Sequence, residues 1–236
     1  MSEIEMTLVN SDNVKKFVLN SFKAMGLKEE DAKIFTDALM FSELRFHSGQ
    51  GQGVQRITTY YKRINNNEVN INSDFEILKE SSSLALVDAK NGIGTVQASK
   101  CMDLAISKAK KEGIGKVIIK NSTHFGSSSV HAVKATQQNC IGIVYTNAGP
   151  EMAAWGSKSG GVGTNPWGIS CPTDRGFPLI LDIALTTAGK GMMRWHEREG
   201  ISMPNDWALT KDGHETTDPS EAMNGFLLGI GKYKGY

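Results

Sequence analysis

The chain has 236 residues, 39% of them hydrophobic and 22% charged, which is typical of a soluble globular protein with a buried core. Its 26 basic and 25 acidic residues leave a formal net charge of +1, so no basic excess predicts a nucleic-acid or anionic-membrane partner. The three widely spaced cysteines predict free thiols in the cytoplasm, and neither a signal peptide nor a membrane-spanning run is visible.

Two helices are predicted at the N-terminus. The first is capped by Ser11 or Asp12, has apolar residues at helical spacing and ends at Gly26. The second covers residues 29–44 and has a broad apolar face. The short link between them predicts a helical hairpin whose apolar faces belong to the core.

A glycine-dense segment follows and ends at Arg56. Its glycines allow the backbone to approach a ligand closely. If a helix resumes at Val54, Arg56 and Tyr60 share one helix face. A guanidinium beside a phenol suits a carboxylate ligand, but a surface arginine next to a half-buried tyrosine explains the pair equally well.

The next part of the chain alternates strand and helix patterns. Strands are predicted over residues 75–78 and 84–88, and a helix over residues 95–112. Gly92 and Gly94, just before this helix, resemble part of a dinucleotide-binding fingerprint. Gln97 stands where the third glycine belongs and the required acidic residue is missing, so tight packing at a turn explains the glycines better.

The strongest candidate for chemistry lies in residues 116–129. A β-branched run predicts a buried strand, polar turn residues follow it, and a helix is predicted over residues 127–139. His124 lies between the strand and the helix, where rigid neighbours hold a side chain that ligands can reach. Its ordinary pKa suits proton transfer, although a lone histidine more often caps a helix or hydrogen-bonds a turn.

The C-terminal half is predicted to be mixed. Strands are expected over residues 141–147, 169–172 and 179–183, a helix over residues 186–199, a hairpin tip at Asp212-Gly213 and a short helix capped by Asp218. Asp182 lies inside an apolar strand, so it needs backbone amides, a ribose hydroxyl or a basic group as partners.

The histidines show no metal-ligand spacing, so no metal site is predicted. His131 is expected on a helix face, and His196 and His214 at the surface. The chain closes with a cluster of glycines and lysines at residues 229–236, which is unusual for a globular domain and typical of a ligand contact.

Six stretches together resemble a known family. IIKNSTHFGSSS, IGIVYTNAGP, AAWGSKSGGVGTNP, LILDIA, WALTKDGHETTDP and IGKYKGY occur in this order. They resemble the type-2 malate/L-lactate dehydrogenases, which include ureidoglycolate, sulfolactate and diketogulonate oxidoreductases, over residues 14–236. The resemblance implies an oxidoreductase that uses NAD or NADP to interconvert 2-hydroxy and 2-oxo acids. Malate is the first guess for the substrate, taken from the name of the family.

The resemblance also implies a fold. It is a mixed α/β (α+β), non-Rossmann NAD(P)-binding fold that begins with the helical hairpin. Residues 1–75 would form a helical part with the substrate-carboxylate turn, and residues 76–236 a mixed-sheet core with the dinucleotide-binding turns. A homodimer with active sites near the subunit interface is implied as well.

Site residues carry over by position. His124 matches the catalytic histidine of the family's Asn-x-x-His-Phe-Gly motif, and Arg56 and Tyr60 match its substrate-carboxylate arginine and the tyrosine four residues beyond. In the mechanism, a neutral imidazole takes the hydroxyl proton while hydride leaves C2. The positions that contact the dinucleotide in the family are Ser128, Thr164, Asn165, Asp182, Ile183, Ala184 and Lys234.

Two departures from the family pattern stand out. Family members have Ser-His-Gly before the arginine, where this chain has Gly51-Gln52-Gly53. Either His47 and Ser48 are the equivalents, shifted by an insertion, or the pair is lost. Family members also continue beyond the position of Tyr236, so we expect a sequence that is interrupted or truncated at its C-terminus.

Two alternatives to the 2-hydroxy acid dehydrogenase stay open. One is a reductase of cyclic 2-imino acids, a reaction that the family also represents. The other is a catalytically silent homologue that binds a dinucleotide or a partner chain without turnover. A panel of substrates distinguishes the imino-acid reductase from the 2-hydroxy acid dehydrogenase. A cofactor-oxidation assay distinguishes the silent homologue from an active enzyme.

Overall fold

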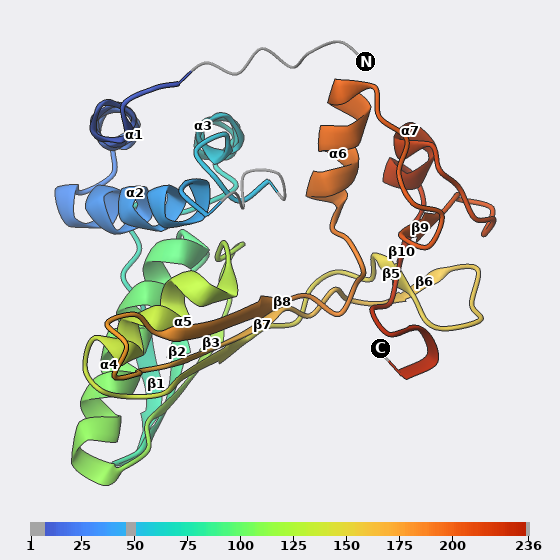
Figure 1. Cartoon of the computed structure of the whole chain (residues 1–236). Coiled ribbons are helices and arrows are strands. Elements are labelled where there is room, and N and C mark those ends of the chain that lie inside the picture. The colour runs from blue at the N-terminus through green and yellow to red at the C-terminus, as the bar shows by residue number, and fades with distance from the viewer. Residues whose placement is uncertain (1–7, 46–50, 235–236) are drawn as a thin grey trace.

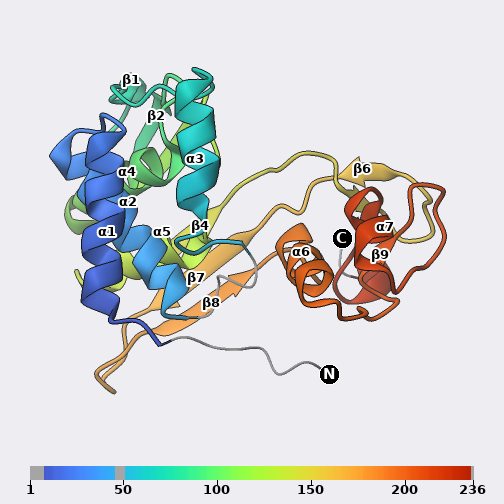
Figure 2. The same cartoon turned by 90° about the horizontal axis from the view of Figure 1, so that it is seen from above.

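The computed structural model describes residues 8–45 and 51–234, which form two lobes joined by extended strands (Figures 1 and 2). The larger lobe holds α1 to α5 with two three-stranded sheets, and the smaller lobe holds α6, α7 and a four-stranded sheet. The mixed α/β class is therefore confirmed. The boundary expected at residue 75 falls inside the larger lobe, between α3 and β1.

The helical hairpin at the N-terminus is confirmed. Its helices are α1 (Ser11–Ala24) and α2 (Glu29–Glu43), and α3 (Arg56–Asn65) follows. The cap of α1 is Asn10, whose side chain accepts a hydrogen bond from the Asn13 amide at 3.0 Å, rather than Ser11 or Asp12. Gly26 ends the first helix with a φ of +93°, a backbone conformation that favours glycine.

Three aromatic side chains form the centre of this helical layer. The rings of Phe22 and Phe35 stack with centroids 4.4 Å apart, and the Tyr60 ring meets Phe35 edge-on at 4.6 Å. All three are almost completely buried. Aromatic rings bury a large apolar area each, so this cluster fixes α3 against the first two helices.

The first sheet contains β1 (Glu76–Glu80), β2 (Leu84–Asp88) and β3 (Lys116–Lys120), in that order. The first two strands are antiparallel, and α4 (Gly94–Glu112) makes the crossover that places β3 parallel to β2. Ala85 and Val87 are buried on one face, whereas Ile118 is 51% exposed on the other. Gly113 ends α4 in the left-handed conformation, as predicted.

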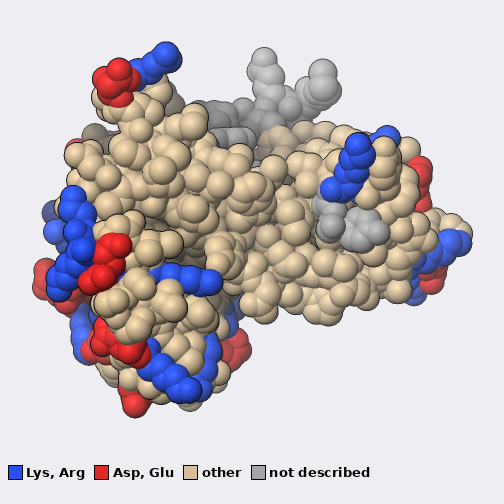
Figure 3. Space-filling model, turned by 90° about the horizontal axis from the view of Figure 1, so that it is seen from below, with Lys and Arg blue, Asp and Glu red and all other residues tan. Residues whose placement is uncertain are grey.

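The second sheet is antiparallel, with β4 (Gly142–Tyr145), β7 (Trp167–Cys171) and β8 (Leu179–Ile183) in that order. One face packs on α5 (Ser128–Thr136), where Gly168 lies so close to Ser128 that a side chain at residue 168 would collide with it. The opposite face exposes Ile143, Tyr145 and Leu181, and the middle of this side of the molecule carries few charged residues (Figure 3).

The smaller lobe consists of short elements. Its sheet has the order β6-β5-β10-β9, from Gly160–Val162, Met152–Ala153, Phe226–Leu228 and Ala208–Leu209. The helices are α6 (Lys190–Glu199), α7 (Pro219–Met223) and a final 3-10 turn, Lys232–Lys234. The expected helix over residues 186–199 therefore begins later than predicted. The strands at residues 152–153, 160–162 and 226–228 were not predicted, because so few residues show no periodicity.

Two predicted local features of the smaller lobe are confirmed. The hairpin at Asp212-Gly213 is closed by a hydrogen bond from the Thr210 amide to the His214 carbonyl at 2.7 Å. The Asp218 carboxylate caps α7 by accepting from the Ser220 amide at 2.7 Å. Among the described residues, no helix is both long and apolar enough to cross a membrane.

Candidate functional site

His124 lies on the loop between β3 and α5, and its backbone is held from several sides. The Tyr60 hydroxyl donates a hydrogen bond to the His124 carbonyl at 2.9 Å. The neighbouring Thr123 hydroxyl donates to the Gly92 carbonyl at 2.9 Å and accepts from the Gly94 amide at 2.9 Å. A side chain at residue 94 would collide with the Thr123 and His124 carbonyls. The packing explanation for these glycines is therefore confirmed.

Arg56, the first residue of α3, brings its guanidinium to this loop. Its Nη2 atom lies 3.4 Å from Nε2 of His124. The same guanidinium donates from Nε to the Gly51 carbonyl and from Nη2 to the Gln52 side-chain oxygen at 3.4 Å. Two residues 68 positions apart in sequence thus form one cluster that combines a guanidinium with an imidazole.

The surroundings of His124 favour its neutral form. The Gly126 amide lies 3.2 Å from Nδ1 and Arg56 lies beside Nε2, so donors face both ring nitrogens. Protein atoms crowd the ring and lower its pKa to about 3, and the positive charge of Arg56 acts in the same direction. Solvent still reaches the side chain, so its desolvation is partial, but desolvation and the charge of Arg56 both lower the pKa of His124. The imidazole is therefore neutral near pH 7.

Arg56 is a cation without an acidic partner among the described residues. Burial is the main cause that lowers its pKa, and repulsion from Arg194 and Arg63 adds to it, while Tyr60 acts in the opposite direction. A partly buried guanidinium that lacks a carboxylate is suited to bind one from a ligand, since its planar fork matches two carboxylate oxygens.

Tyr60 lies one helical turn beyond Arg56 but is turned toward the core. Its side chain is 1% exposed, burial raises its pKa, and its hydroxyl is used by the His124 carbonyl. We predicted that the phenol helps to bind a ligand carboxylate, but in the structure its hydroxyl donates to the His124 carbonyl instead. The packing of Tyr60 against Phe35 explains this orientation, which the spacing alone did not reveal.

The hydrogen-bond partners of the Asp182 carboxylate lie at the start of α5. Its Oδ2 atom accepts hydrogen bonds from the Ser129 amide at 2.9 Å and from the Ser129 hydroxyl. Of the three kinds of partner that were expected, the structure shows a backbone amide. The Ser129 amide at the start of α5 is therefore already engaged by a carboxylate of the chain itself. Ser128 is 1% exposed, and its buried hydroxyl has no hydrogen-bond partner among the described residues.

The remaining predicted cofactor residues follow the strands that join the lobes. Ile183 pairs with Trp167 in β7, and just beyond it the Leu185 amide donates to the Thr164 carbonyl at 2.8 Å. The Asn165 side chain accepts from the Ala148 amide at 3.0 Å. These contacts place five of the predicted positions along one ribbon: Thr164, Asn165, Asp182, Ile183 and Ala184.

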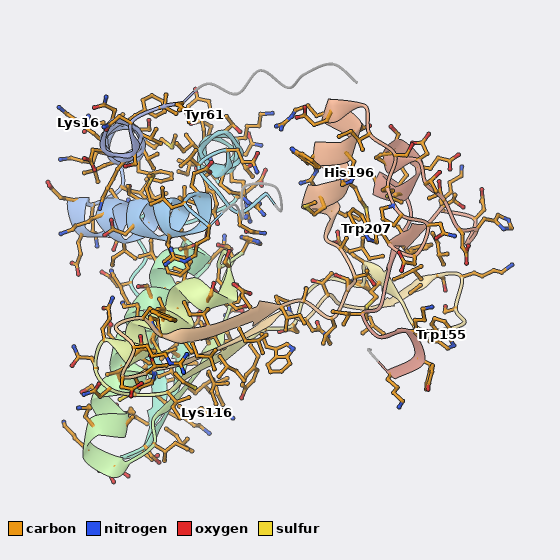
Figure 4. All side chains as sticks on the ribbon, in the orientation of Figure 1. Lys16, Tyr61, Lys116, Trp155, His196 and Trp207 are labelled. Atoms are coloured by element: carbon orange, nitrogen blue, oxygen red, sulfur yellow. The ribbon has the colours of Figure 1, made fainter. Side chains whose placement is uncertain are left out.

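Lys234 lies in the smaller lobe, at the end of the described chain. Its ammonium group is 5.6 Å from the centre of the Tyr233 ring. The Tyr233 ring in turn lies 6.4 Å from the ring of Trp155, which Figure 4 labels near the end of the chain. Among the described residues, Lys234 forms no hydrogen bond with the ribbon.

Two other histidines are more buried than the sequence indicated. His131 lies on α5 as predicted, but its face is the buried one: the ring is 1% exposed, stacks on Phe125 and contacts the Phe125 carbonyl through Nε2 at 2.7 Å. The prediction for His196 is wrong, because its ring is buried and meets the rings of Trp195 and Trp207 edge-on, each at 5.0 Å between centres. Figure 4 labels His196 and Trp207 in the smaller lobe. His214 is exposed, as expected.

His47 and Ser48 lie outside the described residues. Within the described ranges, no group of three or more His, Cys, Asp or Glu side chains is arranged to hold a metal ion. Two shallow hollows of about 420 and 490 Å³ flank the C-terminal half of α4, near Lys110 and Glu112. His124 packs near the opposite end of α4, so neither hollow belongs to its cluster.

Comparison with known proteins places this chain in a family. The profile of the malate/L-lactate dehydrogenase family matches residues 9–236, and the chain belongs to that family. The resemblance found in the sequence motifs is therefore confirmed.

The L-sulfolactate dehydrogenase of Methanocaldococcus jannaschii is 36% identical over 229 residues, which cover 97% of this chain and 66% of the relative. The malate dehydrogenase of Pyrococcus horikoshii is 36% identical, covering 97% of this chain and 65% of the relative. The structure of malate dehydrogenase from Entamoeba histolytica matches with a TM-score of 0.94 at 33% identity, over 98% of this chain and 68% of that one. The chain thus spans about two thirds of the length of these relatives.

Proposed function

We propose that this chain carries the acid/base and carboxylate-binding residues of an NAD(P)-dependent oxidoreductase that interconverts a 2-hydroxy acid and its 2-oxo acid. The observation that carries the proposal is the 3.4 Å approach of the Arg56 guanidinium to the neutral imidazole of His124. The family supports the same chemistry, since similar proteins are named malate and sulfolactate dehydrogenases.

In this proposal Arg56 binds the carboxylate next to the reacting carbon, and so orients the substrate. His124 accepts the proton of the 2-hydroxyl group when the acid is oxidised, and returns it to the carbonyl oxygen in reduction. The substrate carboxylate offsets the charge of Arg56, which raises the pKa of His124 and allows the imidazolium to form. A positioned acid/base of this kind contributes about 10²–10⁴-fold to the rate.

A nicotinamide dinucleotide supplies the hydride chemistry when it is bound. The ribbon from Thr164 to Ala184 offers groups that fit it. Asp182 uses only Oδ2 for Ser129, so Oδ1 is left to accept from a ribose hydroxyl. The exposed ammonium of Lys234 suits a phosphate. Ser128 does not fit as a side-chain ligand, because its hydroxyl is buried.

Tyr60 takes a positioning role in this proposal. Its hydroxyl holds the carbonyl of His124 while its ring packs in the aromatic core, so it transmits the rigidity of the helical layer to the acid/base group. Because it is buried, it acts through His124 rather than on the substrate.

The homodimer and the cytoplasmic location are also proposals. Ile143, Tyr145 and Leu181 expose 58%, 65% and 40% of their surface on the uncovered face of the second sheet (Figure 3). Apolar faces of this kind are typical of contact surfaces, which supports a second subunit there. The three cysteines are unpaired, which supports a reducing compartment.

A cofactor-oxidation assay with the full-length protein tests the function. We expect absorbance loss from NADH or NADPH with oxaloacetate or pyruvate, and a loss of turnover of about 100-fold or more in His124→Ala with nearly unchanged dinucleotide binding. His214→Ala, exposed on the smaller lobe, is the matched control. Turnover of cyclic 2-imino acids alone would favour the imine reductase, and a flat trace with every substrate would favour the silent homologue.

A further inference from the structure

The smaller lobe reaches the His124 cluster through α6. A side-chain carbon at Gly51, in the loop that leads to Arg56, would lie 3.7 Å from the Cα atom of Gly191 in α6. Figures 1 and 2 show α6 facing this end of the helical layer from the other lobe. The contact therefore brings the first turn of α6 against the loop that positions the guanidinium of Arg56.

Arg194 lies on the same side of α6 as this contact. It follows Gly191 by three residues, a spacing that places both on one helix face. Its side chain is exposed, and its positive charge is close enough to Arg56 to disfavour the charge there. The charge of Arg194 thus reaches Arg56 from the other lobe, on the helix whose first turn lies beside the loop at Gly51.

Neither Arg56 nor Arg194 forms an ion pair with an Asp or Glu side chain among the described residues. The acidic residues of α6 are engaged elsewhere: Glu197 accepts from the Ser220 hydroxyl at 2.6 Å, and Glu199 pairs with Arg198 at 2.7 Å. Two like charges without a counter-ion repel each other, so binding of a ligand with negative charge would relieve this repulsion.

We propose that Arg194 binds the second acidic group of the substrate, so that the site prefers 2-hydroxy acids with two anionic groups over those with one. This inference rests on the proposed function. Arg56 takes the carboxylate next to the reacting carbon, and Arg194 takes a distal carboxylate or sulfonate. Arg194 is then a specificity-determining residue, and a doubly charged substrate links the two lobes.

The first test compares two 2-oxo acids in the full-length enzyme. In Arg194→Gln we expect the ratio of kcat/KM for oxaloacetate to kcat/KM for pyruvate to fall about 10-fold or more, mainly through KM for oxaloacetate. Arg194→Lys should recover part of the ratio, because it restores the charge without the planar fork. Arg198→Gln, on the same helix, is the control and should leave the ratio unchanged. An unchanged ratio in Arg194→Gln would overturn the proposal.

A second test needs no turnover, so it separates this proposal from the proposed function. Thermal unfolding is measured with malate and with lactate at equal concentrations, in the wild-type protein and in Arg194→Gln. We expect malate to raise the melting temperature more than lactate does, and the substitution to abolish that difference. Equal effects of the two acids on the wild-type protein would refute a second anion site, even if the enzyme proves active.

Discussion

The two lobes differ in what fills their cores. The helical layer of the larger lobe is centred on the aromatic rings of Phe22, Phe35 and Tyr60, whereas the smaller lobe is centred on Met152, Met193 and Met203. Aromatic rings have few rotatable bonds and pack in fixed geometry, while methionine adapts its shape to its neighbours. From these residue types we expect the larger lobe to be the more rigid of the two and the smaller lobe to be the more adaptable.

The contacts of the proposed site follow this division. His124 is tied to the aromatic core through the Tyr60 hydroxyl, so its position depends on that packing. Arg194 lies on α6, whose buried residues Met193 and His196 belong to the smaller lobe. Acid/base chemistry needs fixed geometry, whereas recognition of different distal groups tolerates an adaptable support.

The largest effect should come from the aromatic core. Phe35→Ala removes a ring that contacts both Phe22 and Tyr60, and we expect a loss of about 3–5 kcal/mol in the free energy of unfolding. Urea unfolding followed by circular dichroism measures it. Phe17→Ala is the matched control, because this ring is 65% exposed on α1. A loss below about 1 kcal/mol would contradict the assignment of a rigid core.

A smaller effect should follow from lowering the pH. Burial lowers the pKa of His131 to about 4, against the hydrogen bond with the Phe125 carbonyl, which raises it, while the charges of Lys134 and Asp182 act in opposite directions. Between that value and the ordinary 6.5, the unfolded chain binds more protons than the folded one, so stability falls as the pH falls through this window. His131 accounts for at most about 3 kcal/mol of that decline.

The measurement is the free energy of unfolding in urea from pH 7 to pH 4. In His131→Gln the amide can still donate to the Phe125 carbonyl but does not titrate, so we expect a shallower decline than in the wild-type protein. Carboxyl groups titrate in both proteins and cancel in the comparison. If the free energy of unfolding falls in parallel with pH in both proteins, His131 does not cause the decline.

The smallest effect should come from the methionine core. Met193→Leu keeps the volume of a fully buried side chain in the smaller lobe, and we expect a loss below about 1.5 kcal/mol with unchanged cooperativity. Thermal unfolding of the full-length protein measures it. A loss as large as that of Phe35→Ala would show that the smaller lobe is packed as tightly as the larger one, and would end the contrast between them.

The sequence by itself determined the elements whose pattern is local. The helix at residues 29–43 has an apolar face repeated over four turns, and the strand Leu179–Ile183 was predicted with its observed limits. The motif around His124 identified the family, which the profile match confirms. Such features depend on neighbours a few residues away, so periodicity and turn chemistry are sufficient to reveal them.

Only the tertiary structure decided which distant groups meet. Asp182 reaches an amide 53 residues away, and Tyr60 turns its hydroxyl to a carbonyl 64 residues away. His196 is buried because two tryptophans surround it, and the charge of Arg194 reaches Arg56 because the lobes come together at Gly51 and Gly191. No local pattern records these pairings, because long-range packing alone fixes the direction of a side chain relative to residues far along the chain.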